Sequence, residues 1–457
     1  MESFLSQHGI KLKEDEQKFR SIISNKIFTA GSTIIISYPL ASFPLLTFNK
    51  FRCDQCLKTS HDSTPLRTCS KCQCVYYCNR SCQKSSWLSH HKWLCSNYTK
   101  SKGVEDYDEE MLKRVSILID KFLNDEKLDP FFENKGYLFE IFFKLMTHRN
   151  DHEHVKNLVK FERISTKVHE ILKFNKVTKD DLINHLCRFH CNNFTIHDSQ
   201  LFTYGEGTYP IGSLFNNSCR PNAIVMYDGA TQIIKCIQDI SIGDEINISY
   251  VDVALDRTTR QKLLREKYFF KCQCPRCSPD EQHSGILTKI DQLIEDKGFT
   301  VSENEEITAL ILSNLLPHLK NHTKMMDYIN SLCEIISTLL EKNHLFDISS
   351  LSSTTKLFYD KIDLKQWNQS TILGKYILSI YLLIYPRYHP IIALHLFTLG
   401  KCYWNDITGG LESVKEAINI LEYAKNILNI THNEGDENKD VIKQVNDLLD
   451  MAKKEVT

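Results

Sequence analysis

The sequence contains no long apolar run and no strong excess of charge. A membrane-spanning helix needs about 20 consecutive apolar residues, whereas a run such as STIIIS at residues 32–37 has only the length of a strand. The first twenty residues are polar and include acids, so they lack the apolar centre of a signal peptide. We therefore expect an intracellular protein with no membrane association.

The formal net charge of −1 excludes a global field that would draw the chain to nucleic acid or lipid. Aromatic residues make up 10% of the chain, which argues against disorder. At 457 residues, with 42% hydrophobic residues, the chain is too long for one core and should form two or more domains.

What the chain does have is seventeen cysteines in an unusual distribution. Eight lie between Cys53 and Cys95, and three more between Cys272 and Cys277. Because disulfides are rare in a reducing compartment, this clustering favours metal binding.

The first cluster is a series of short-spaced pairs, in CDQC, CSKCQC, YYCNRSC and HHKWLC. Seven cysteines and one histidine provide two sets of four soft ligands, which two tetrahedral zinc sites require. Zinc would then be the main source of folding energy for so short a segment. The alternative is that these are unligated buried cysteines.

These residues resemble the MYND zinc finger, a module that generally binds peptides. The resemblance implies one zinc on Cys53, Cys56, Cys78 and Cys82, and another on Cys69, Cys72, His91 and Cys95. Cys74 is then left over. His90 remains an alternative to His91, although the spacing in HKWLC favours His91.

The segment 51–100 carries eight basic residues against two acidic ones. Such a patch is a solvated surface or a contact for a partner, and the resemblance favours a protein partner over a weak nucleic-acid contact.

The second cluster, YFFKCQCPRC, has only Cys272, Cys274 and Cys277, which leaves a tetrahedral zinc one ligand short. The candidate for the fourth ligand is Cys219, in the turn segment NNSCRPN.

In this order, GEGTYPIGSLFNNSCRPN, IGDEINISY and CQCPRC resemble the SET domain and post-SET segment of lysine methyltransferases. With the MYND finger before them, the chain is similar to the SET and MYND (SMYD) family over nearly its whole length. The resemblance implies S-adenosylmethionine and about three zinc ions as cofactors, a protein substrate with a target lysine, and a place in the cytoplasm and nucleus. In that family a cysteine equivalent to Cys219 joins the three post-SET cysteines on zinc.

The expected fold is α+β and multidomain: a SET fold interrupted by a finger and a helical insert and followed by a TPR-like helical domain. We expect a monomer. Strand-like residues support the first part, and helical spacing in MLKRVSILIDKFL, LFEIFFKLM and AINILEYAKNILNI supports the insert and the C-terminal helices. The expected parts are 1–48, N-terminal SET; 49–97, finger; 98–185, insert; 186–253, SET core; 254–280, zinc segment; and 281–457, helical domain.

Methyl transfer to lysine needs a neutral amine aligned with the methyl group, and a narrow aromatic channel favours the neutral form by desolvation. By the resemblance, Phe194, Tyr250 and Tyr268 would line this channel, with the Tyr250 hydroxyl orienting the reactants. The alternative interpretation of each of these aromatic residues, taken singly, is an ordinary place in the core. Cofactor contacts are expected from the following residues: Asn192, Asn216, Asn217, Tyr250, Phe270 and, more weakly, His148.

Two departures from the family pattern bear on activity. The glycine-rich G-x-G motif is replaced by Phe19-Arg20-Ser21, and the histidine before Ser218 is Asn217. In one interpretation, Arg20 compensates for the missing glycines by contacting the carboxylate of S-adenosylmethionine. In the other, Phe19 fills the pocket and blocks cofactor binding. Two hypotheses follow: an active protein-lysine methyltransferase, or a zinc-organised interaction scaffold that has lost the cofactor. The sequence leaves open the substrate and the degree of methylation.

Overall fold

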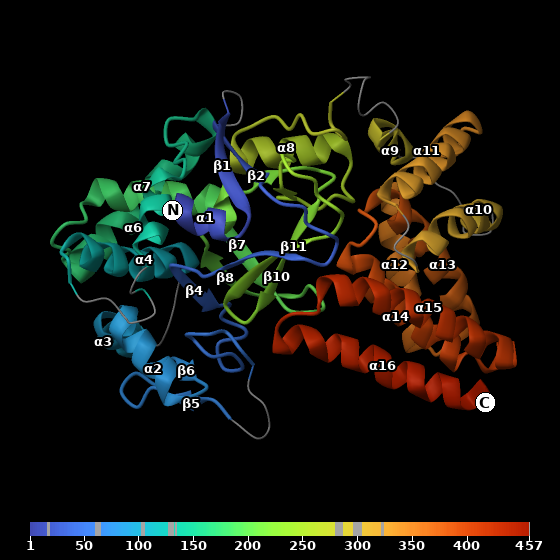
Figure 1. The fold of residues 1–457 in the computed structure, drawn as a ribbon. Coiled ribbons are helices and arrows are strands. Elements are labelled where there is room, and N and C mark those ends of the chain that lie inside the picture. The colour runs from blue at the N-terminus through green and yellow to red at the C-terminus, as the bar shows by residue number, and fades with distance from the viewer. Residues whose placement is uncertain are drawn as a thin grey trace.

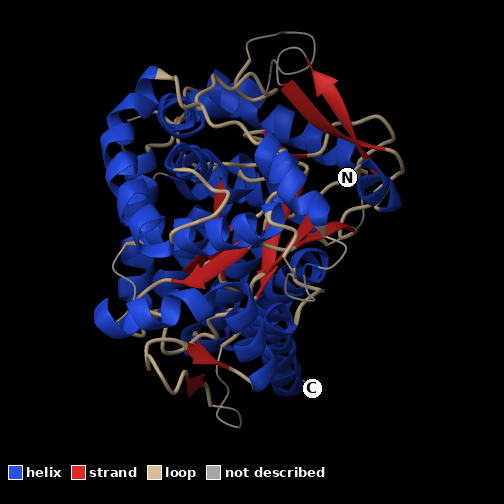
Figure 2. Ribbon diagram, turned by 90° about the vertical axis from the view of Figure 1, so that its left-hand side faces the viewer, coloured by secondary structure: helices blue, strands red, loops and turns tan. Residues whose placement is uncertain are grey.

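The computed structural model describes residues 1–15, 19–59, 65–101, 106–126, 132, 135–278, 287–295, 304–320 and 324–456. The strands and helices of the N-terminal half lie on one side of the molecule, and the helices of the C-terminal half lie on the other (Figure 1). Some of the strands cross the middle of the molecule among helices, whereas others lie at its upper and lower edges (Figure 2). In the described residues, no helix is long and apolar enough to cross a membrane.

The chain begins with a short helix that no pattern in the sequence predicted, α1 (Glu2–Gln7), followed by the antiparallel hairpin of β1 (Ile10–Asp15) and β2 (Phe19–Ser24). Gly31 then takes a positive φ of 92°, which favours glycine, in the turn before β3 (Thr33–Ser37). Strand β4 (Ala41–Pro44) follows and is buried along its whole length.

The finger has little regular structure, consisting of β5 (Arg67–Thr68), β6 (Tyr76–Tyr77), α2 (Arg80–Ser86), the π-helical turn Trp87–His91 and α3 (Lys92–Ser101). Asn79 begins α2, because its side chain accepts a hydrogen bond from the Cys82 backbone N–H at 2.8 Å. Cysteines make up much of the finger's small core.

The described part of the insert is helical and contains α4 (Tyr107–Leu123), α5 (Gly136–Lys144), α6 (His152–Leu172) and α7 (Lys179–Asn192). Helix α7 begins at a capping box, in which Thr178 and Asp181 satisfy each other's backbone N–H groups. The predicted helix in LFEIFFKLM ends at Lys144, so Leu145 and Met146 lie beyond it.

The central strands form two three-stranded sheets, ordered β10-β11-β3 and β4-β8-β7, and a short parallel pair of β12 with β9. Their bounds are β7 (Asn193–His197), β8 (Thr203–Thr208), β9 (Asn216–Asn217), β10 (Ala223–Asp228), β11 (Thr231–Cys236) and β12 (Asn247–Ile248). Helix α8 (Arg257–Tyr268) leads into the segment that contains Cys272, Cys274 and Cys277.

The C-terminal half consists of helices α9 (Ile290–Leu293), α10 (Glu305–Leu315), α11 (Met325–Glu341), α12 (Ile348–Asp363), α13 (Trp367–Ile384), α14 (Pro390–Asn405), α15 (Gly410–Thr431) and α16 (Asp436–Val456). Consecutive helices from α12 to α16 pack against one another around one large apolar core. The expected α+β class, with its helical C-terminal half, is confirmed. The boundaries between the parts stay predictions, and the one expected at residues 280 and 281 lies outside the described residues.

Candidate functional site: three cysteine clusters and a tyrosine-lined cavity

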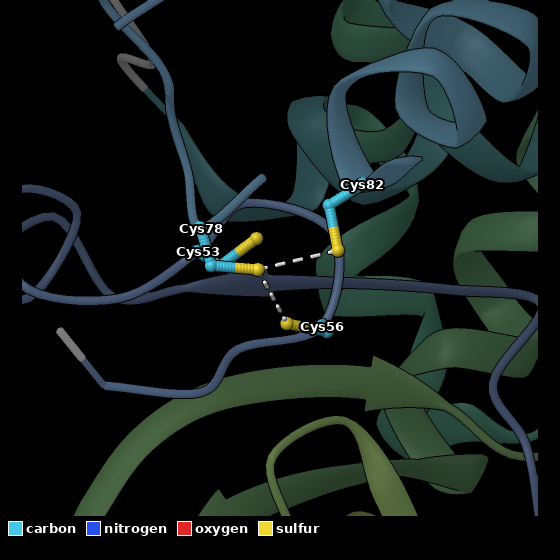
Figure 3. A group of neighbouring side chains, drawn as sticks. All are labelled: Cys53, Cys56, Cys78 and Cys82. Carbon is cyan, nitrogen blue, oxygen red and sulfur yellow. Dashed lines mark hydrogen bonds between the residues drawn. The ribbon is translucent and has the colours of Figure 1, made fainter. Parts of the chain in front are cut away.

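The finger brings Cys53, Cys56, Cys78 and Cys82 together, and their side chains point toward one another (Figure 3). The Cys78 sulfur lies 3.7 Å from that of Cys56 and 3.4 Å from that of Cys82. These residues come from two loops and the start of α2, so the cluster joins separate parts of the finger.

The second finger cluster contains Cys69, Cys72, His91 and Cys95. The sulfurs of Cys69 and Cys95 lie 3.9 Å apart, and His91 Nε2 lies 3.7 Å from the Cys72 sulfur. The structure therefore places His91, rather than His90, among the cysteines.

The two residues that the ligand pattern leaves over have other contacts. His90 Nε2 lies 3.6 Å from Asp54 and 3.4 Å from the Ser86 hydroxyl. The Cys74 thiol donates to the carbonyl oxygen of Cys72 at 3.0 Å.

Asp54 also pairs with the buried Arg114 at 2.7 Å. Although burial opposes it, Arg114 together with His90 holds the pKa of Asp54 below its usual value.

The third cluster joins Cys219 to Cys272, Cys274 and Cys277, as the ligand count predicted. The sulfurs of Cys277 and Cys219 lie 3.6 Å apart. Cys219 is brought there because β9 pairs with β12 and the Ser218 N–H donates to the Ile248 carbonyl at 2.8 Å.

All three clusters fit a tetrahedral zinc ion. With Zn–S bonds of about 2.3 Å, neighbouring ligand sulfurs would lie about 3.8 Å apart. Within each cluster the candidate ligand atoms lie within 4.8 Å of one another. The clusters are thus consistent with three zinc ions, and the individual ligand assignments stay predictions.

A cavity of about 420 Å³ is lined by residues of the central strands and of the C-terminal helices. Two of its lining residues, Tyr250 and Tyr268, pack against the third cluster. Phe194, Tyr250 and Tyr268, the residues predicted to line the lysine channel, all border the cavity, as does Asn192. Phe194 projects from β7 and meets Tyr209 edge-on, with 5.9 Å between ring centres.

Tyr250 is held from two sides. Its hydroxyl donates to the Phe215 carbonyl at 2.5 Å, and its ring lies 4.8 Å from that of Tyr268. The Tyr268 hydroxyl donates to the Tyr250 carbonyl at 3.4 Å. Burial raises the pKa of Tyr250, so its hydroxyl stays protonated at neutral pH.

Arg20 and Asn216 meet each other rather than the cavity. The Asn216 amide donates to the Arg20 carbonyl at 2.6 Å and to Glu245 at 2.9 Å. The Arg20 guanidinium donates to the Ser213 carbonyl at 3.0 Å. Burial lowers the pKa of Arg20, while Tyr250 and Cys191 act electrostatically in the opposite direction. The Phe19 side chain lies outside the described part of the chain.

The three remaining residues that were predicted to contact the cofactor lie in different surroundings. Asn217 bridges the Tyr250 backbone and the third cluster. Phe270 meets Tyr250 edge-on at 6.3 Å between ring centres. His148 stacks on Phe269 at 4.8 Å and lies outside the cavity lining.

Sequence reasoning missed several residues that line the cavity, namely Cys191, His197, Lys267, Tyr385 and His389. Tyr385 and His389 come from the C-terminal half, which no local motif connects with β7. Cys191 is the first residue of the segment CNNFTI at 191–196, which also contains Phe194, and His197 follows it directly; that proximity was the available signal.

The basic patch of the finger is smaller than the residue count indicated. Arg52 is buried and pairs with Glu437 of α16 at 3.4 Å, and Lys58 pairs with Asp228 at 3.1 Å. The exposed basic side chains that remain in the described finger are Arg67, Lys71, Arg80, Lys84 and Lys92.

Residues 53–95 match the family model for the MYND finger. Over 94% of its length, the chain is 28% identical to histone-lysine N-methyltransferase ASHR1 of Arabidopsis thaliana, with 93% of that protein covered. It is 26% identical to histone-lysine N-methyltransferase SMYD3 of Homo sapiens (88% of each chain) and 24% identical to N-lysine methyltransferase SMYD2 of Homo sapiens (89% of this chain, 92% of the relative). The chain is a distant homologue of the SET and MYND methyltransferases over about nine-tenths of its length.

Proposed function

We propose that the protein is an S-adenosylmethionine-dependent protein-lysine N-methyltransferase. The observation that carries the proposal is the joint placement of Phe194, Tyr250 and Tyr268 on one cavity. The homology to lysine methyltransferases over most of the chain supports the same reaction class.

The residues in and around the cavity fit the cofactor in their chemistry. Asn192, Tyr250 and Tyr268 line it and offer an amide and two aromatic faces for a cationic centre. Arg20 and Phe270 are not among its lining residues, and they would add a guanidinium for a carboxylate and a further aromatic face. When bound, S-adenosylmethionine supplies a methyl group on a positively charged sulfur. Asn216, whose amide bonds to Arg20 and Glu245, stays a proposed cofactor residue.

The aromatic walls would act on the substrate lysine in two ways. They exclude water, which lowers the pKa of the ammonium group and favours the neutral amine. The protonated Tyr250 hydroxyl would orient that amine rather than remove its proton. The proton would therefore leave to solvent, and two of the cavity's lining residues, Lys267 and Asp252, are exposed.

A second candidate is an interaction scaffold without cofactor affinity. It is favoured by the Arg20 segment, where side chains replace glycines and the guanidinium bonds to the protein's own Ser213 carbonyl. In both candidates the finger would bind a peptide partner, and we propose zinc at all three clusters.

Calorimetric titration with S-adenosylmethionine, on wild type and on the double variant Phe19→Gly/Ser21→Gly, separates the two candidates. We expect wild type to bind and the variant to bind about equally, with Arg20→Ala weakening binding. Transfer of labelled methyl groups to a lysine-containing protein should accompany binding. A wild type that does not bind, beside a variant that does, would establish the scaffold and overturn the enzyme.

A further inference from the structure

The sulfurs of the third cluster accept hydrogen bonds from two side chains that are not among its four candidate ligands. The Asn217 amide lies 3.4 Å from the Cys272 sulfur, and the Arg260 guanidinium lies 3.7 Å from the Cys277 sulfur. The Cys219 backbone N–H adds a third such bond, to the Cys274 sulfur at 3.3 Å.

Asn217 makes a second contact with its other end. Its side-chain oxygen accepts the Tyr250 backbone N–H at 2.8 Å. One amide therefore spans the distance between a cluster sulfur and the residue that we propose as catalytic. Asparagine can do both because it carries a donor and an acceptor on the same planar group.

Arg260 also reaches in two directions. It is fully buried and donates to both carboxylate oxygens of Asp291 in α9, each at 2.9 Å. Arg276 donates to the same carboxylate at 2.7 Å. Helix α9 belongs to the helical C-terminal half, so Arg260 and Asp291 connect the cluster with that half.

A tetrathiolate site that holds a divalent ion carries about two negative charges, which are costly to bury without nearby cations and N–H donors. Groups in this position orient the ligands and raise metal affinity. The contacts of Asn217 and Arg260 match that requirement, and each contact continues to a part of the fold beyond the cluster.

We propose that Asn217 and Arg260 are positioning residues that couple metal binding at the third cluster to Tyr250 and to α9. Metal binding at the third cluster then stabilises both the position of Tyr250 and the contact that α9 makes with Arg260. The role of Tyr250 rests on the proposed function, whereas the coupling itself does not.

The test is zinc release from the full chain into a chromogenic chelator, combined with hydrogen exchange of the peptides that contain Tyr250 and Asp291. Asn217→Leu should release one ion per chain about 10-fold faster, in line with the usual effect of such groups. The Tyr250 peptide should exchange faster in the same variant. Asn217→His should restore both properties, because a neutral imidazole again offers one donor and one acceptor.

Arg260→Lys keeps a positive charge but loses the guanidinium fork, so it should speed release of the same ion and exchange of the Asp291 peptide. The chain offers a matched control for each change. The Asn222 side chain lies in the same segment but bonds to backbone groups of Glu245 and Asn247, and Arg265 lies on the same helix as Arg260 but is exposed. Asn222→Leu and Arg265→Lys should leave the release rate of that ion unchanged.

Unchanged release and exchange in folded Asn217→Leu and Arg260→Lys proteins would overturn the coupling. Equal acceleration in the controls would do the same, because it would show a general loosening. Coupling without any methyl transfer by wild type would contradict the proposed function alone.

Discussion

Arg52 of the finger and Glu437 at the start of α16 form an ion pair at 3.4 Å, although 385 residues separate them in the chain. Both side chains are largely buried, and the Glu437 carboxylate also accepts the Thr59 backbone N–H at 3.0 Å. The finger is thus attached to the last helix as well as to the central sheets.

Glu437→Ala should loosen this attachment, because it leaves the buried Arg52 guanidinium without its carboxylate. We expect a loss of about 2 kcal/mol in the free energy of unfolding. Thermal unfolding, together with proteolysis in the segment after Phe51, measures the effect. Asp436→Ala is the control, since Asp436 is 88% exposed and its pair with Lys58 should contribute little. Equal effects of the two changes would contradict a specific role of Glu437.

Tyr250→Phe should preserve the fold and cofactor binding but reduce the rate of methyl transfer by about 100-fold or more. The hydroxyl that contacts the Phe215 carbonyl at 2.5 Å is the group that the change removes. Single-turnover methyl transfer and calorimetry on the same preparation give the two readouts.

Tyr204→Phe removes a comparable buried hydroxyl away from the cavity, one that donates to the Gly229 carbonyl at 2.7 Å. It should cost about 1 kcal/mol of stability and leave turnover nearly unchanged. A Tyr250→Phe variant that turns over as fast as Tyr204→Phe would show that the channel is assigned wrongly.

Cys219→Ser should lower the zinc content from about three to about two ions per chain, because a serine hydroxyl is a poor replacement for a thiolate. Metal analysis of the purified variant is the measurement. Cys402→Ser is the control, since Cys402 is equally buried in α14 but belongs to no cysteine cluster among the described residues. Three zinc ions per chain in both variants would show that Cys219 is an ordinary buried residue and not a zinc ligand.

The cysteine clusters were the most predictable part of the molecule. Zinc ligands must have particular side chains at short spacings, so the three cysteines at 272–277 lacked a fourth ligand and Cys219 was a candidate for it. The family resemblance favoured Cys219, and the structure brings it together with Cys272, Cys274 and Cys277. The choice between His90 and His91 was harder, because both follow the same local pattern. Only the fold shows that His90 faces Asp54 and His91 faces Cys72.

The cavity was less predictable because its walls come from distant segments. Phe194 and Tyr250 were recognisable from local motifs, but Tyr385 and His389 approach them only through packing of the C-terminal helices. Asn216 also has a contact that its motif did not predict, because its amide bonds to the Arg20 carbonyl across 196 residues.

A last prediction concerns acid sensitivity, and it follows from His395 in α14. The His395 Nε2–H donates to the Gly374 carbonyl at 2.8 Å, and burial lowers the pKa of His395 to about 4. In the unfolded chain the pKa is about 6.5, so below that value the unfolded state binds more protons than the folded state. The stabilisation is complete above pH 6.5 and is lost as the pH falls toward 4.

At pH 5 this loss amounts to about 2 kcal/mol for His395 alone. His395→Gln keeps a side-chain N–H for Gly374 but cannot titrate, so its stability should fall less steeply with pH. Urea unfolding at pH 8, 6.5 and 5 measures the difference, with zinc content checked at each pH. At pH 8 both proteins carry a neutral side chain, so that comparison isolates the cost of the substitution itself. Parallel pH profiles for wild type and His395→Gln would contradict the prediction, because they would show that His395 protonates equally in the folded and unfolded states.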